Sequence, residues 1–291
     1  MGLKKIILAL VIFVIVFVGF NGFQHKHQKK INDVSKDIIV QRDVRYTNLA
    51  QVPQTFDIYR SKNSHGPSPT LIFVHGGSWR YGSKALNKRW STIFNEVVKD
   101  GYIAISIDYT LYSKENYSYN IPVSDVKTAI EFIYKNSTEL GIDRTKIGLA
   151  GASAGGHLAL LTGLQPDIQS KIKYIIAWYP ITDLTTMNQS TSSRSSEIVD
   201  KYMNSSVDQM TDEYNRMSPI QYVEKTKVPI FIVHGTGDQL VPFSQSERFA
   251  KKNPKMVTLI ALKNGNHGFT NLSIQKSTND TINYLKARLK K

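Results

Sequence analysis

Short apolar runs alternate with amphipathic helical patterns over about 200 residues of this sequence. Alternation of this kind predicts an α/β fold with a mostly parallel, doubly wound sheet. The predicted buried strands are Thr70–Val74, Tyr102–Asp108, Ile147–Ala150, Tyr174–Tyr179, Val228–Val233 and Met256–Leu262. Two further strands, Ile38–Tyr46 and Thr55–Arg60, are expected at the edge of the sheet.

A glycine-rich stretch directly follows four of the predicted buried strands. In open parallel sheets, ligands bind beyond the carboxyl ends of the strands. The four stretches should therefore meet at one surface, and this surface should receive His75-Gly76-Gly77, Ser153, Asp238 and His267.

Ser153 lies at the centre of a Gly151-x-Ser-x-Gly155 turn between a predicted strand and a predicted helix. A sharp turn of this type exposes the serine hydroxyl, and the free N–H groups at the start of the helix favour a developing anion. The pattern alone arises by chance in about one chain in ten of this length at average glycine and serine usage. Its interpretation therefore depends on the residues that accompany it.

The other residues at this surface complete a nucleophilic site. A serine hydroxyl becomes reactive when a base removes its proton, and a carboxylate holds that base in one tautomer. The order Ser153, Asp238, His267 predicts a catalytic triad with His267 as the base and Asp238 as its partner. The expected oxyanion hole consists of the backbone amides of Gly76, Gly77 and Ala154.

The composition excludes several other kinds of site. The 291-residue chain has no cysteine, which excludes disulfides, a thiolate nucleophile and a cysteine-based metal site. We expect no cofactor and no metal. The formal net charge is +14, but the basic residues are scattered and no recognition motif accompanies them, so nucleic-acid binding is not expected. The charge instead favours attraction to an anionic membrane or cell wall.

The N-terminus carries an apolar run from Ile6 to Phe20 behind two lysines, and with Asn21, Gly22 and Phe23 the run reaches 18 residues. As a helix the run is about 27 Å long, which predicts a signal anchor or signal peptide over residues 1–23. Phenylalanines stand where a signal peptidase requires small residues, which favours an uncleaved anchor. Residues 24–37 are polar and are interpreted as a tether to a catalytic domain over residues 38–291. We expect this domain to lie outside a cell membrane, or to be secreted if the segment is cleaved.

Residues 185–224 interrupt the alternation with a polar stretch that contains no buried strand. An insertion of this size between strands is typical of a cap or lid over a binding site. A surface excursion without substrate contact is the alternative.

The sequence resembles the α/β-hydrolase superfamily in its HGG-type esterase/lipase branch. The resemblance covers approximately Thr70 to the C-terminus and is strongest for small carboxylesterases that are feruloyl- or acetyl-esterase-like, or kynurenine-formamidase-like. It is carried by His75-Gly-Gly-Ser-Trp79, Asp108-Tyr109, Gly151-Ala-Ser-Ala-Gly-Gly-His157, Gly237-Asp238-x-x-Val241-Pro242 and Asn266-His267-Gly268-Phe269. The resemblance implies an α/β-hydrolase fold with an inserted cap, and it assigns the triad and oxyanion hole to the residues named above. Ser78 departs from the pattern, since many lipases have a third glycine there.

The expected function is hydrolysis of carboxylic esters of small or short-acyl molecules through an acyl-enzyme on Ser153. An arylformamidase, amidase or peptidase with the same triad is an alternative, and so is a catalytically silent ligand-binding protein. Trp79, Tyr109 and Trp178 are expected to shape the substrate pocket together with the insertion. The sequence does not predict the oligomeric state.

Overall fold

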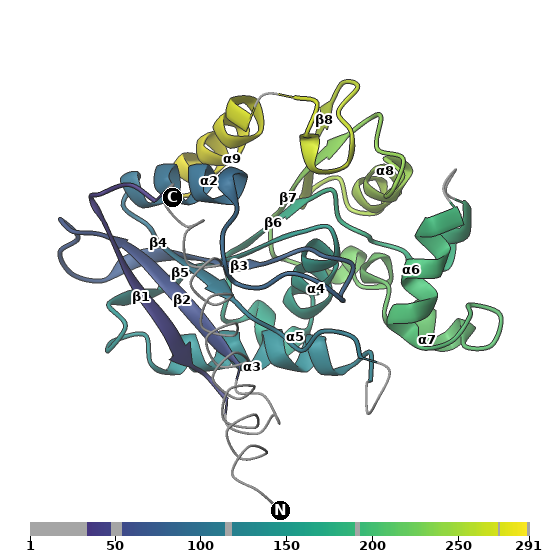
Figure 1. The fold of residues 1–291 in the computed structure, drawn as a ribbon, viewed down its shortest axis with the longest axis horizontal. Coiled ribbons are helices and arrows are strands. Elements are labelled where there is room, and N and C mark those ends of the chain that lie inside the picture. The colour runs from purple at the N-terminus through teal and green to yellow at the C-terminus, as the bar shows by residue number, and fades with distance from the viewer. Residues whose placement is uncertain (1–33, 48–53, 114–117, 190–192, 273, 290–291) are drawn as a thin grey trace, which may run out of the picture. The chain divides into compact units, whose positions relative to one another are not determined.

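Eight strands form one sheet in the part of the chain that the structure describes, in the order β1-β2-β4-β3-β5-β6-β7-β8 (Figure 1). The structure is a computed structural model, and it describes residues 34–47, 54–113, 118–189, 193–272 and 274–289. The strands are β1 Ile38–Arg45, β2 Thr55–Ser61, β3 Ser68–Val74, β4 Ile103–Ile107, β5 Ile142–Ala152, β6 Tyr174–Trp178, β7 Ile230–Gly235 and β8 Val257–Leu262.

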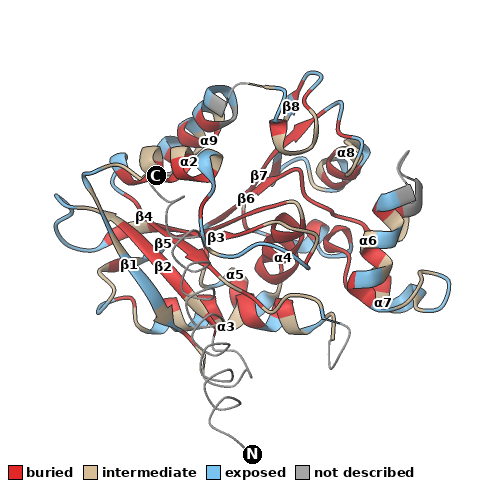
Figure 2. Cartoon of the chain, in the orientation of Figure 1, coloured by how far each residue is buried: buried red, intermediate tan, exposed pale blue. Residues whose placement is uncertain are grey.

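The sheet is parallel from β4 to β8, as the alternation of strands and helices predicts. The two N-terminal strands form an antiparallel pair at one edge, where β2 pairs with β4. β4, β6 and β7 are buried along their whole length, which explains why they are continuous apolar runs in the sequence (Figure 2).

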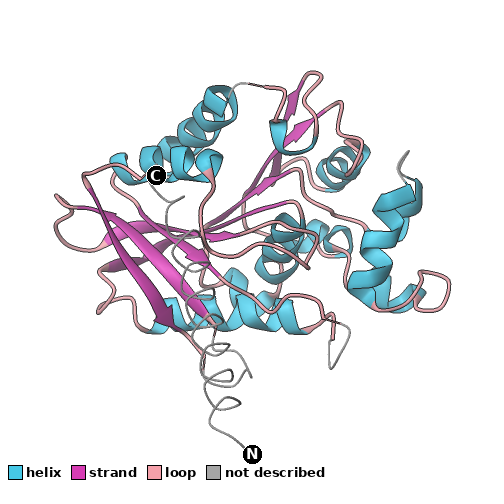
Figure 3. Cartoon of the chain, viewed as in Figure 1, coloured by secondary structure: helices cyan, strands magenta, loops and turns pink. Residues whose placement is uncertain are grey.

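Helices cover both faces of the sheet (Figure 3). α2 and α9 pack together on one face, whereas α3 and α4 pack together on the other. The α-helices are α2 Lys88–Lys99, α3 Ile121–Lys135, α4 Ala154–Gly163, α5 Pro166–Gln169, α6 Ser193–Met203, α7 Thr211–Arg216, α8 Ser244–Lys252 and α9 Ile274–Leu289. The 3-10 helices are η1 Leu184–Gln189, η2 Pro219–Gln221, η3 Val223–Lys225 and η4 His267–Phe269.

The order of the strands reverses around β3. The chain passes from β3 outward to β4 and then returns to place β5 on the other side of β3. A reversal of this kind opens a crevice at the carboxyl ends of the two central strands. The loop after β3 carries His75-Gly76-Gly77, and the turn after β5 carries Ser153, so both stretches lie at this crevice.

The predicted cap segment, residues 185–224, contains most of η1 together with α6, α7, η2 and η3. The predicted N-terminal anchor, residues 1–23, lies outside the described residues, and so does most of the predicted tether. None of the helices in the described ranges is both long enough and apolar enough to span a bilayer.

Candidate active site

Ser153 occupies a strained turn between β5 and α4. Its backbone angles are φ 54° and ψ −120°, a combination that residues other than glycine rarely adopt. Glycine is required on both sides, because a Cβ at Gly151 would lie 2.1 Å from the carbonyl oxygen of Gly155. A Cβ at Gly155 would lie 2.2 Å from the carbonyl oxygen of Val74. The two glycines therefore permit the sharp turn that the sequence motif predicts.

The three residues of the predicted triad lie in one hydrogen-bonded line. The Nε2 atom of His267 is 3.1 Å from the Oγ atom of Ser153, and its Nδ1 atom is 2.8 Å from the Oδ2 atom of Asp238. With Asp238 ionised, the Nδ1–H group donates to the carboxylate and leaves Nε2 free to accept the serine proton. Three loops, which follow β5, β7 and β8, bring these residues together.

Asp238 is held in its ionised form by four hydrogen-bond donors. Its Oδ1 atom accepts the backbone N–H groups of Leu240 and Val241, at 3.0 and 2.9 Å. Its Oδ2 atom accepts from His267 and lies 3.3 Å from the Nε2 atom of His234. Burial alone would raise the pKa of the Asp238 carboxyl, but the hydrogen bonds, chiefly from His234 and His267, outweigh burial and hold the pKa below its ordinary value.

His234 was not among the predicted site residues. It is fully buried at the end of β7, its Nδ1 atom is 2.7 Å from the Oγ atom of Ser246, and its Nε2 atom is 3.0 Å from the carbonyl oxygen of Val241. These partners fix the ring so that Nε2 points toward the carboxylate of Asp238. The spacing His-Gly-x-Gly-Asp is the one signal in the sequence that points to this contact.

Of the three amides predicted for the oxyanion hole, that of Ala154 directly follows Ser153 and that of Gly76 lies beside it. A Cβ placed on Gly76 would be 3.4 Å from the Cβ of Ser153, so this glycine packs against the serine. Gly77 has a φ of 129°, and a Cβ there would lie 1.9 Å from the carbonyl oxygen of Tyr81. Within the described residues, the amides of Gly76, Gly77 and Ala154 donate to no protein acceptor. They are therefore available to an oxyanion.

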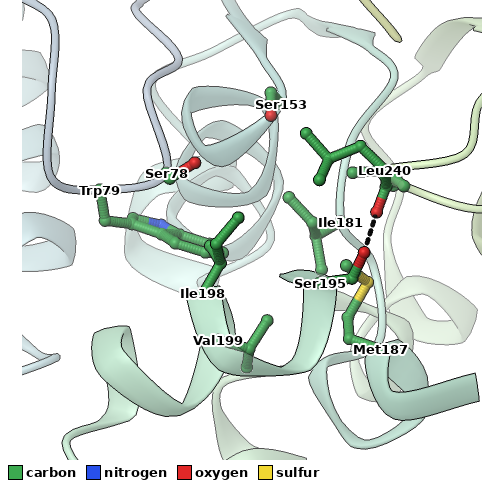
Figure 4. A pocket seen from close by; sticks show the side chains of 10 residues that line it. Ser78, Trp79, Ser153, Ile181, Met187, Ser195, Ile198, Val199 and Leu240 are labelled. Atoms are coloured by element: carbon green, nitrogen blue, oxygen red, sulfur yellow. Dashed lines mark hydrogen bonds between the residues drawn. The ribbon is translucent and has the colours of Figure 1, made fainter. Parts of the chain in front are cut away.

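A small apolar cavity lies beside the Ser153 hydroxyl (Figure 4). Its volume is about 10 Å³, which is room for about one water molecule. The segment from η1 to α6 supplies one wall with Met187, Ser195, Ile198 and Val199. Ser195 donates a hydrogen bond of 2.7 Å to the carbonyl oxygen of Leu240, which ties α6 to the loop after β7. The insertion thus contributes directly to the surroundings of the serine.

One of the three predicted pocket aromatics lines this cavity, and the other two lie elsewhere. Trp79 is part of the wall (Figure 4). The ring of Tyr109 stacks on His75 at 4.4 Å, and its hydroxyl donates to the His75 carbonyl oxygen, so it braces the loop after β3. Trp178 packs against Trp90 at 5.0 Å and is buried in the core. Its strand is buried on both faces, so alternation in the sequence does not reveal which face its side chain occupies.

A cluster of three aromatic rings joins α6 to the active-site loops. Trp79 stacks on Tyr202 of α6 at a centroid distance of 4.2 Å, and His157 of α4 packs edge-on against both rings, at 5.1 and 5.6 Å. The Nε2–H group of His157 donates to the carbonyl oxygen of Met217 at 2.8 Å, whereas its Nδ1 atom is buried without a partner in the described structure. The ring is therefore neutral, and burial lowers its pKa to about 4.

We expect the low pKa of His157 to make the fold less stable in acid. The unfolded histidine titrates near 6.5 and the folded one near 4, so the unfolded state binds more protons between these values. Stability contributed by the neutral ring is present above pH 6.5 and is lost as the pH falls toward 4, by up to about 3 kcal/mol. His157→Gln retains a donor for Met217 but does not titrate. The free energy of unfolding, measured with urea at pH 7 and at pH 4.5, should therefore fall less between these two pH values in the variant than in wild type. Equal losses in both proteins would contradict the prediction.

Within the described residues, no group of three or more His, Cys, Asp or Glu side chains is arranged to hold a metal ion.

The family model named BD-FAE matches residues 56–253, which is more than half of the chain. The chain belongs to the BD-FAE family. This BD-FAE member is 29% identical to Esterase LipC of Mycobacterium tuberculosis over 233 residues, which cover 74% of the chain and 57% of LipC. It is 25% identical to the isoprenylcysteine alpha-carbonyl methylesterase ICME of Arabidopsis thaliana, over 72% of the chain and 51% of ICME. The chain thus spans about half the length of these curated relatives.

Solved esterase structures share the fold of this BD-FAE member. A truncated carbohydrate esterase from gut microbiota superposes with a TM-score of 0.78 at 21% identity, covering 89% of this chain and 99% of that one. Esterase 2 of Thermogutta terrifontis phosphonylated by sarin superposes with a TM-score of 0.70 at 25% identity, covering 84% and 94%. The predicted α/β-hydrolase fold and the resemblance to HGG-type esterases are therefore confirmed.

Proposed function

We propose that this protein is a serine carboxylesterase that acts on esters with a small acyl group. The observation that carries the proposal is the hydrogen-bonded line from Ser153 through His267 to Asp238. The amides of Gly76, Gly77 and Ala154, which have no acceptor among the described residues, are consistent with it. The names of its relatives LipC and ICME support an ester as the substrate.

In the proposed cycle, the Oγ atom of Ser153 attacks the ester carbonyl carbon while the Nε2 atom of His267 takes its proton. The carbonyl oxygen becomes an oxyanion and accepts hydrogen bonds from the amides of Gly76, Gly77 and Ala154. When the tetrahedral intermediate collapses, His267 donates the proton to the departing alcohol. A water molecule then repeats the attack on the acyl-enzyme, with His267 again as the base.

The size of the cavity supports a small acyl group. Room for about one water molecule is comparable to the methyl group of an acetyl ester. A longer acyl chain in this cavity would have to displace Ile198 or Val199 of α6. We therefore propose that the insertion over residues 185–224 acts as a cap that limits the acyl group.

A covalent inhibitor tests the proposal directly. The protein should hydrolyse 4-nitrophenyl acetate, and paraoxon should abolish this activity by transferring one diethylphosphoryl group to Ser153. Intact-mass analysis and peptide mapping would locate the group. A peptide map with phosphorylation only at other residues, or no inactivation, would refute the serine mechanism.

The amide alternative uses the same residues and is separated by its substrate. Formanilide and phenyl formate present the same acyl group with nitrogen or oxygen as the leaving atom. The proposal expects kcat/KM to be higher for the ester after correction for the intrinsic reactivity of each compound. A preference for formanilide would favour the arylformamidase alternative.

We also propose that residues 1–23 anchor the chain in the cell membrane with the catalytic domain outside, or direct its secretion if they are cleaved. The apolar run from Ile6 to Phe20 and the lysines before it support this location. Cell fractionation with sequencing of the mature N-terminus separates the two forms. Recovery of the intact chain in the soluble cytoplasmic fraction would contradict both.

A further inference from the structure

A groove with basic side chains adjoins the cavity at Ser153. Its volume is about 250 Å³, and it shares the side chains of Ser78 and Ile198 with the smaller cavity. The loop after β3 forms one side of the groove and α6 forms the other. An ester whose carbonyl group lies at Ser153 therefore has a path for one of its two arms into this groove.

The groove carries an excess of positive charge. Its charged residues are three cations, Arg80, Arg194 and Lys201, and one carboxylate, Glu197. Lys201 forms an ion pair with Glu197 one helical turn away, which compensates one charge of each sign. Arg194 is also within electrostatic range of Glu197, but neither Arg80 nor Arg194 forms an ion pair with any described residue. Two guanidinium groups thus remain available to an anion.

The side chain of Arg80 extends from a rigid loop. The backbone N–H groups of Arg80 and Tyr81 both donate to the carbonyl oxygen of Gly77, at 3.0 and 2.8 Å. Trp79, between them and the predicted oxyanion hole, is buried and stacked on Tyr202 of α6. This stack joins the two sides of the groove, and it holds the loop that carries Gly77 and Arg80 in place against α6.

An exposed tyrosine supports one of the two guanidinium groups. Tyr81 is 62% exposed, and the guanidinium carbon of Arg80 lies 5.4 Å from the centre of its ring. This cation–π contact limits the positions of the guanidinium without using its N–H donors. A planar guanidinium held in this way can pair with two oxygens of a carboxylate or phosphate.

We propose that this groove is an anion subsite, in which Arg80 and Arg194 hold a carboxylate or phosphate on one arm of the ester substrate. The inference rests on the proposed function, because it assigns to that esterase a substrate that is both esterified and anionic. The open groove, the two guanidinium groups that form no ion pair with a described residue, and the shared wall with the Ser153 cavity support it. The excess of basic residues along the whole chain would also favour the approach of such a substrate.

Matched pairs of esters test the subsite in the full-length protein. An anionic acyl arm would have to lie in the groove and not in the small cavity, and its pair is 4-nitrophenyl hydrogen glutarate and 4-nitrophenyl hexanoate. For an anion on the alcohol arm, the pair is 4-acetoxybenzoate and 4-acetoxybenzamide. In at least one pair, the ratio of kcat/KM for the anionic to the neutral ester should be about tenfold lower in the double variant Arg80→Gln/Arg194→Gln than in wild type. The wild-type ratio should also fall in 0.5 M NaCl, since exposed charges are screened.

A double variant with the same loss of charge serves as the control. Lys62 and Arg144 are exposed at the end of the sheet that lies opposite the active site, where the parallel strands begin. Lys62 directly follows β2, and Arg144 lies near the start of β5. Lys62→Gln/Arg144→Gln should leave the ratio as in wild type. The proposal is overturned if both double variants lower the ratio equally, because the effect would then come from net charge. It is also overturned if Arg80→Gln/Arg194→Gln changes only the binding of the protein to phosphatidylglycerol vesicles.

Failure of this proposal is distinct from failure of the proposed function. An esterase without an anion subsite hydrolyses 4-nitrophenyl acetate and shows no change in either ratio when the arginines are replaced. A protein that is not an esterase hydrolyses none of these compounds.

Discussion

Replacement of Ser153 by alanine is expected to lower kcat/KM for 4-nitrophenyl acetate by at least about 10⁴-fold. The variant retains the oxyanion amides, the cavity and His267, but it has no atom that can form the acyl-enzyme. The remaining rate should therefore come only from substrate binding and the oxyanion hole. Active-site titration with paraoxon should find no reactive group, and an unchanged rate would refute the assignment of Ser153 as the nucleophile.

Loss of activity in this variant would result from the missing nucleophile and not from unfolding. Alanine keeps the Cβ atom of Ser153, so the turn at φ 54° and the packing against Gly76 are preserved. The free energy of unfolding should change by less than about 1 kcal/mol. Ser195→Ala is a matched control, because it removes a hydroxyl from the same cavity without touching His267. It should lose its hydrogen bond to Leu240 and reduce the rate by less than about tenfold.

The parallel sheet could be predicted because its central strands are buried on both faces and therefore appear as apolar runs. β5 shows the limit of this signal. β5 begins at Ile142, five residues before the predicted apolar run at Ile147. The residues between them are polar and partly exposed. The polar half has no apolar pattern, so the sequence predicts only the buried part of the strand.

The residues of the site differ in how well the sequence specifies them. Glycines around Ser153, Asp238 and His267 mark loops at the carboxyl ends of strands, so these residues could be selected and expected to meet. His234 could not be selected in this way, since its role depends on Ser246 of α8 and on contacts that form only after folding. The side of the sheet that Trp178 occupies was likewise undetermined, because both faces are apolar.

Replacement of Asp238 by asparagine is expected to lower kcat by about 10⁴-fold with little change in KM. The orientation of the new amide follows from its neighbours. The backbone N–H groups of Leu240 and Val241 point at the Oδ1 position, so the amide oxygen of the asparagine must remain there. The NH₂ group then takes the place of Oδ2, opposite the Nδ1 atom of His267.

This exchange reverses the hydrogen bond that orients the imidazole. In the wild type, the Nδ1–H group donates to the carboxylate over 2.8 Å. In Asp238→Asn, the amide donates to Nδ1, which forces the proton of His267 onto Nε2. The Nε2–H group then faces the Ser153 hydroxyl and cannot accept its proton, so attack on the ester is prevented. Substrate binding does not involve residue 238, which is why KM should change little.

Asp57→Asn is the matched control for loss of a buried carboxylate. Asp57 lies on β2, between the edge strand β1 and β4, and is 2% exposed. It accepts hydrogen bonds from Arg42 and from the backbone of Asp43, both at 2.9 Å. Its replacement should lower the free energy of unfolding by about 1–3 kcal/mol and leave kcat within about threefold of wild type. If Asp238→Asn also stayed within tenfold of wild type, the carboxylate would not set the tautomer of His267. Some other contact would then have to keep the Nε2 atom of His267 unprotonated and able to accept the proton of Ser153.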